Sequence, residues 1–221
     1  MKILKRILPI IFLTSVLATA QNINWKSINP EHKNLSTFEF GYDFGLTSQL
    51  GFYKFLNTSK PIYLGIDASV PMGNVILDDF KLRTSGLIKL HEINNYILSA
   101  KVSTIFTRHE TNVVRMASFG TEFSMLVGYH KPGWHVSVEL GHHKSISTHL
   151  KHSTRMSQNY PDIKDGWYIP TEGHFFLGIQ GSKSINPSLD ISFRAGSISN
   201  ESNDEKPTIP LYTQIGLVKS F

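Results

Sequence analysis

The feature that most constrains this chain is an alternation of apolar and polar residues with a period of two. In residues 79–91, for example, Phe80, Leu82 and Ile88 share one face, while Lys81 and Arg83 lie on the other. The same alternation occurs in residues 38–52, 62–70, 96–106, 119–129, 134–140, 175–182, 189–196 and 209–221. Because successive side chains of a strand point to opposite faces of a sheet, these segments predict nine strands, each with one apolar face.

Residues 38–52 form a longer segment in which the apolar residues keep even numbers throughout. A two-residue hairpin inside this segment would reverse that parity, so the pattern predicts one long strand. Ile23, Trp25 and Ser27 predict a further short strand before it. Since bacterial membrane barrels normally have an even number of strands, we expect ten strands, with eight or twelve as alternatives.

The connections between these strands alternate in length. Short turns are expected near 57–60, 92–94, 131–133 and 184–187, and longer connections at 71–78, 107–114, 145–170 and 198–207. Short turns at one end and long loops at the other are typical of an antiparallel up-and-down transmembrane β-barrel, with the short turns in the periplasm. The segment 145–170 is then the longest extracellular loop.

Alternation alone is also compatible with a soluble lipocalin-like barrel, in which the apolar face points inward. Two features favour the membrane barrel, whose apolar face meets lipid. The polar faces are rich in Gly and Ser, which suit a crowded interior. Aromatic residues of the apolar faces also gather near strand ends, which is typical of membrane interfaces: Phe52, Tyr96, Tyr129, Trp134 and Phe221 near short turns, and Phe80, Phe106 and Phe119 near long ones.

The first twenty residues have the three parts of a secretory signal peptide. Basic residues at 2, 5 and 6 precede an apolar stretch at 7–17, and Ala18-Thr19-Ala20 supplies small residues for cleavage. We therefore expect a cleaved signal at 1–20 and a mature barrel at 21–221. Three of the positive residues in a chain of net charge +5 belong to this segment, so a nucleic-acid partner is not expected. The absence of Cys excludes disulfides and thiolate chemistry.

The last strand predicts a partner in assembly. Gln214, Gly216, Leu217 and the final Phe221 resemble the C-terminal signal read by the barrel-assembly machinery of Gram-negative outer membranes, although Lys219 stands where that signal has a hydrophobic residue. With the segments 78–81 and 164–171, the mature chain resembles the small, uncharacterised outer-membrane β-barrel proteins common in Bacteroidota-type bacteria. This resemblance implies a fold and an outer-membrane location, and it supplies no catalytic residues.

The polar faces place many charged residues in the expected lumen. Because unpaired buried charges are costly, they predict an ion-pair network, and a water-filled pore is the alternative. The expected network comprises Asp67, Asp79, Lys81, Arg83, Lys101, Glu122, Glu139, Asp190 and Arg194, with Glu39, Asp43 and Lys89 also on polar faces.

The segment 145–170 is the main candidate for ligand or partner binding. It is long and partly aromatic, so we expect it to fold over the barrel mouth, where its basic first half could meet lipopolysaccharide phosphates or a protein partner. A lid that only closes the barrel is the alternative. The candidate residues are His149, Lys151, His152, Arg155, Tyr160, Asp162, Asp165, Trp167 and Tyr168.

Two chemical hypotheses are weaker. His142, His143, His149 and His152 could bind a divalent metal or haem, but their spacing matches no zinc motif, so no cofactor is expected. Asp162, Asp165, His149 and His152 could serve a barrel hydrolase, but no G-x-S-x-G motif is present. The favoured function is a non-enzymatic outer-membrane barrel that is structural or binds a surface ligand or partner. A narrow transporter of small or hydrophobic solutes is the alternative.

Overall fold

The computed structural model describes residues 22–28, 33–43, 45–72, 78–170, 173–201 and 210–221; the expected signal segment lies outside these ranges. The strands are β1 (Asn34–Tyr42), β2 (Leu46–Leu56), β3 (Ile62–Pro71), β4 (Phe80–Ile93), β5 (Tyr96–Glu110), β6 (Val114–Lys131), β7 (Trp134–His152), β8 (Gly166–Tyr168), β9 (Gly173–Asn186), β10 (Leu189–Asn200) and β11 (Leu211–Ser220). One short helix, α2 (Thr154–Asn159), lies between β7 and β8.

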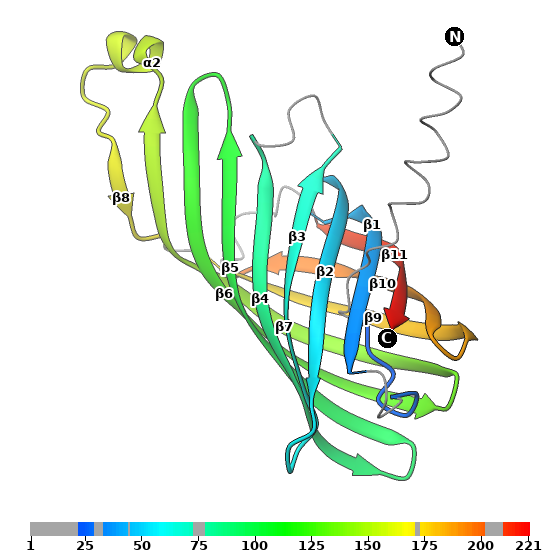
Figure 1. Cartoon of the computed structure of the whole chain (residues 1–221). Helices are drawn as coiled ribbons and strands as arrows, with labels where there is room; N and C mark the ends of the chain where they lie inside the picture. Colours follow the sequence, from blue (N-terminus) through cyan, green and yellow to red (C-terminus); the bar gives the residue numbers. More distant parts are fainter. Residues whose placement is uncertain (1–21, 29–32, 44, 73–77, 171–172, 202–209) are drawn as a thin grey trace, which may run out of the picture.

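Ten of these strands form a closed antiparallel barrel (Figure 1). Each pairs with its neighbours along the chain, β7 pairs with β9, and β11 closes the ring on β1 with Leu217 opposite Phe38. The strand β8 is outside the ring and pairs only with β7. The predicted ten-stranded up-and-down barrel is therefore confirmed.

The predicted single strand over 38–52 is wrong, because β1 and β2 form a hairpin within it. Tyr42 pairs with Leu46 across a connection of three residues. An odd number of loop residues gives the paired residues the same parity, so the apolar pattern passes through the turn without reversal. A turn of two residues would instead have reversed it.

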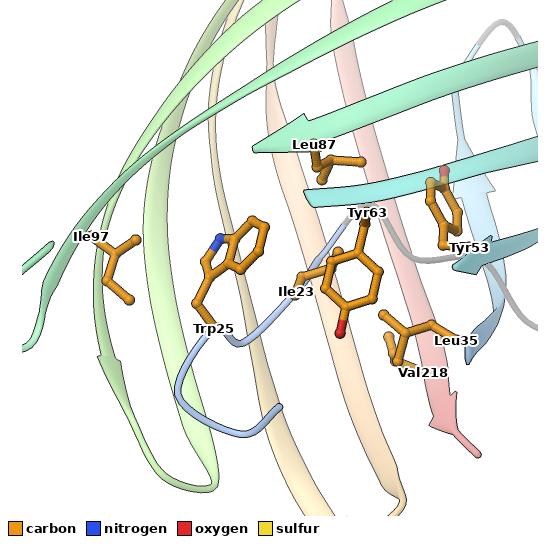
Figure 2. Close-up of a cluster of buried hydrophobic side chains, with 8 residues drawn as sticks. All are labelled: Ile23, Trp25, Leu35, Tyr53, Tyr63, Leu87, Ile97 and Val218. Atoms are coloured by element: carbon orange, nitrogen blue, oxygen red, sulfur yellow. The ribbon is translucent and has the colours of Figure 1, made fainter. Parts of the chain in front are cut away.

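The predicted strand around Ile23 and Trp25 is also wrong. The connections at 57–61, 94–95, 132–133 and 187–188 define what we call the lower end of the barrel. Residues 22–28, here called the plug, enter the barrel at this end (Figure 2). Because β1 and β11 pair with each other and close the barrel, no free strand edge remains for another strand. The apolar plug residues instead join a buried cluster with Leu35, Tyr53, Tyr63, Leu87, Ile97 and Val218.

The apolar faces of the barrel strands point outward and the polar faces point inward. On β3, Leu64 and Ile66 are 50% and 54% exposed, whereas the alternate residue Asp67 is 2% exposed. This arrangement is the reverse of a soluble barrel. The interior is also tightly packed: a Cβ added at Gly65 would lie 2.2 Å from Cδ1 of Tyr53.

The opposite, upper end does not carry the long loop predicted at 145–170. The strand β7 continues to His152, and α2 and β8 occupy much of the remainder. Likewise, β5 and β6 continue through most of 107–114. We call this extension, residues 106–119 and 145–168, the fin; it prolongs the barrel wall upward instead of folding across the mouth (Figure 1). Its strands were missed because both of their faces carry polar residues.

Candidate functional site

The interior of the barrel is organised around the carboxylate of Asp67. Arg83 Nε donates a hydrogen bond of 2.6 Å to Asp67 Oδ1, and Gln49 Nε2 donates to the same oxygen at 3.0 Å. Tyr53 OH donates to Asp67 Oδ2 at 2.9 Å. Because the carboxylate has three donors, one of them cationic, it can remain charged in a buried position.

Three further ion pairs continue this network. Lys101 Nζ lies 3.0 Å from Glu122 Oε1, and Lys81 Nζ lies 2.8 Å from Asp43 Oδ2. Arg194 Nε lies 2.7 Å from Glu139 Oε2 on β7, although β9 separates their two strands. The guanidinium of Arg194 also lies 4.6 Å from the ring centroid of Tyr212.

Other expected members of the network lie elsewhere. Asp79 contacts His109, with 2.5 Å between Oδ1 and Nδ1, and both side chains are partly exposed. Asp190 borders a cavity of about 40 Å³ beside the plug. Lys89 pairs with Glu92 at the lower end, at 2.9 Å. The structure therefore separates these residues from the network around Asp67.

One wall of the interior has unsatisfied polar groups. Among the described residues, six buried side chains on β1, β9, β10 and β11 have an oxygen without a hydrogen-bond partner: Thr37, Glu39, Gln180, Ser192, Tyr212 and Gln214. Buried polar atoms of this kind normally bind internal water. The cavities beside the plug, of about 40 and 10 Å³, have room for water and not for a larger solute.

The plug is held by polar contacts as well as by packing. Asn22 Nδ2 donates to the carbonyl oxygens of Gly181 and Phe193, at 2.7 and 2.6 Å. Asn24 Nδ2 donates to the carbonyl of Lys131 at 2.9 Å, and Ser27 Oγ accepts from the Gly133 amide at 3.0 Å. These contacts join the plug to β9, β10 and the β6–β7 turn, so it closes the lower mouth as part of the fold.

The outer face of the fin carries a charged cluster that was not predicted from the sequence. Arg115 donates two hydrogen bonds to Glu110, from Nε at 2.8 Å and from an Nη at 2.9 Å, and Arg108 also donates to this carboxylate. These hydrogen bonds, first from Arg115 and then from Arg108, lower the pKa of Glu110 to about 2. Lys151 on β7 lies opposite Arg115 in the strand register.

A row of aromatic rings lies beside and below this cluster on the same face, with Phe80 opposite Arg108 in the strand register. The ring centroids of Phe80 and Phe106 are 5.8 Å apart, and those of Phe106 and Phe119 are 4.9 Å apart. Trp167 of β8 extends the row, 6.2 Å from Phe119, and packs edge-on against His149 at 5.0 Å. The fin therefore presents charged groups above an aromatic band.

The other residues predicted for ligand binding are more scattered. His152 donates from its backbone amide to Asp165 Oδ1 at 2.8 Å, and its Nδ1 lies 2.8 Å from the same oxygen. Tyr168 OH donates to the carbonyl of Lys164 at 2.6 Å. Tyr160 is exposed, and within the described part of the chain Arg155 and Asp162 form no side-chain hydrogen bond or ion pair. The structure thus brings together His149 with Trp167 and His152 with Asp165.

The candidate metal-binding histidines do not converge. His142 Nε2 lies 2.6 Å from Glu201 Oε1, and Lys144 Nζ lies 2.8 Å from Glu201 Oε2. His143 points to the other face and stacks on His174, with ring centroids 4.6 Å apart. In the ranges that the structure describes, no group of three or more His, Cys, Asp or Glu residues is arranged to hold a metal ion.

Two comparisons with known proteins add no assignment to this geometry. A comparison with protein-family models found no match, and a comparison with curated proteins found none either. Among the described residues, no helix is both long and apolar enough to cross a membrane.

Proposed function

We propose that this chain is a small integral barrel of a Gram-negative outer membrane, of the Bacteroidota type that its sequence resembles. In this proposal the outer apolar surface meets lipid, the interior and the plug make the barrel a closed scaffold, and the fin binds a surface ligand or partner. The barrel-assembly machinery would read the C-terminal strand, β11, which pairs with β1.

The observation that carries the proposal is a pair of aromatic rows on the outer surface. The lower row includes Tyr96, Tyr129 and Trp134, with ring centroids 5.2 and 5.7 Å apart. The upper row includes Phe106 and Phe119. Ten residues separate the two rows along both β5 and β6. At about 3.4 Å per residue and a tilt of about 40°, the rows are about 26 Å apart, close to the apolar height of an outer-membrane barrel.

The location is tested by separating the membranes of cells that express the full chain. We expect the protein in the outer-membrane fraction, and its migration in a gel should change on heating because the closed barrel resists detergent until it unfolds. Recovery of the folded protein from the soluble periplasmic fraction would overturn the proposal.

A narrow transporter is the second candidate, because the unsatisfied polar wall from Tyr212 to Thr37 could hold a file of water. The ion pairs and the plug oppose it, since they leave little free width. In planar bilayers we expect no stable conductance from the full chain. A reproducible open state would favour the transporter. A hydrolase would rest on His152 and Asp165, and no described Ser joins their contact.

A further inference from the structure

The cluster on the fin combines three basic side chains with nearby carboxylates. Arg108, Arg115 and Lys151 share the outer face with Glu110, and Asp78 and Asp165 act electrostatically on Arg115 and Lys151. Arg115 is 47% exposed, and within the described ranges Lys151 forms no ion pair. The feature that suits a phosphate group is therefore the set of exposed N–H donors on these side chains, rather than an excess of charge.

Glu110 also gives the cluster a fixed geometry. It receives hydrogen bonds from both arginines, which come from adjacent strands. The two guanidinium groups are therefore held side by side before any ligand binds, and each keeps further N–H groups for an incoming oxygen. A ligand would have to order little more than the side chain of Lys151, which reduces the entropic cost of binding.

The position of the cluster requires an amphipathic ligand. Arg108 lies two residues from Phe106 on the same face of β5, and Arg115 lies four residues from Phe119 on β6. At about 3.4 Å per residue, Arg108 is about 7 Å from Phe106 and Arg115 is about 14 Å from Phe119 along their strands. A molecule with a phosphate above and acyl chains below would meet both features, as lipids do at a membrane interface.

An exposed indole beside the cluster favours a ligand that also carries sugars. Trp167 is 61% exposed and lies on the outer face next to His149, which precedes Lys151 by one position on that face of β7. Its flat ring is open to stacking by a ring of similar size. A glycerophospholipid headgroup would leave this surface uncovered.

We propose that the outer face of the fin binds a lipopolysaccharide, with a phosphate of its lipid A held by Arg108, Arg115 and Lys151 and its acyl chains along Phe80, Phe106 and Phe119. This inference rests on the proposed outer-membrane location and names the ligand of the fin. Its site is the outer face of β4 to β8, and it does not need the residues of α2.

The test uses the full mature chain, folded in detergent and then placed in lipid nanodiscs. The probes are diphosphorylated lipid A, the same lipid without phosphates, and phosphatidylglycerol, each measured by native mass spectrometry. The test variant combines Arg115→Gln and Lys151→Gln. The matched control is Lys144→Gln, which removes an exposed outer-face lysine that pairs with Glu201 instead. Heat-modifiable migration checks that every variant is folded.

We expect the double variant to bind diphosphorylated lipid A at least about tenfold more weakly, and the control to match the wild type. Lipid A without phosphates should bind weakly to all three proteins. Equal binding by the double variant and the wild type would overturn the inference, and so would equally tight binding of phosphatidylglycerol. Failure of the wild type to enter nanodiscs as a folded barrel would count against the proposed function, whereas a folded barrel without lipid A preference would count against this inference alone.

Discussion

The plug and the fin differ in the exposure of their tryptophans. Trp25, in the plug, is 7% exposed and packs against Tyr63 with ring centroids 5.7 Å apart. Trp167, in the fin, is 61% exposed. The plug is folded into the lower mouth of the barrel, whereas the fin projects from the upper end with aromatic and charged side chains exposed. This difference indicates that the plug mainly stabilises the barrel and that the surface of the fin is accessible.

The largest expected contrast is between an arginine inside the barrel and one on the outer face of the fin. Arg83→Ala leaves the buried Asp67 carboxylate with one fewer donor, so we expect a loss of about 3 to 5 kcal/mol in the free energy of unfolding. Arg115→Ala removes an exposed ion pair and should leave the free energy of unfolding nearly unchanged. Urea titrations of the folded barrel in lipid vesicles measure both. Similar losses for the two variants would contradict the contrast between the interior and the fin.

The tryptophans themselves provide the next contrast. Trp25→Ala removes a large buried side chain from the plug cluster, so we expect a loss of about 3 kcal/mol in the free energy of unfolding. Trp167→Ala should change it by below about 1 kcal/mol. The same urea titrations measure both variants, and unfolding is followed by circular dichroism because each variant lacks a tryptophan. A plug that contributes nothing would show Trp25→Ala as stable as the wild type.

Two valines test whether the apolar belt meets lipid and the turn at the top of the fin does not. Val102 lies on the outer face of β5 between Tyr96 and Phe106, and Val113 lies in the turn of the fin. An arginine at position 102 would enter hydrocarbon, so Val102→Arg should cost about 2 kcal/mol or more when the barrel folds into vesicles. Val113→Arg should fold like the wild type. Equal folding of both variants would argue against a membrane belt at this height.

The strands and their outward faces were predictable because burial imposes a strict period of two on β3 to β7 and β9 to β11. Two predictions were wrong because the period of two shows neither where an odd-length turn lies nor whether a segment pairs in the sheet. The hairpin at Tyr42 and Leu46 has an odd loop, which leaves the pattern unchanged. Ile23 and Trp25 alternate like a strand, but whether they pair depends on a free sheet edge, which is a property of the whole barrel.

The cluster on the fin depends on information that no local pattern contains. Arg115 meets Lys151 only because β6 and β7 pair in one register, and a bulge at Phe119 and Gly120 shifts that register in the middle of the strands. Lys151 was predicted from its basic neighbourhood, whereas Arg115 was not. Extending the outward parity of Phe119 by four residues would have placed Arg115 on the outer face.

The smallest expected effect is the response of the fin to acid. Glu110 has its pKa lowered from 4.5 to about 2 by hydrogen bonds from Arg115 and Arg108. A group whose pKa is lowered in the folded state stabilises that state above its unfolded pKa and loses this contribution as the pH falls toward its folded pKa. Hydrogen-exchange protection of residues 108–115 should therefore decrease between about pH 4.5 and pH 2. Glu110→Gln should lack this decrease, because the variant has no proton to gain at that position. If the wild type and Glu110→Gln lost protection equally, the acid response would come from other groups and Glu110 would not hold the arginine pair together.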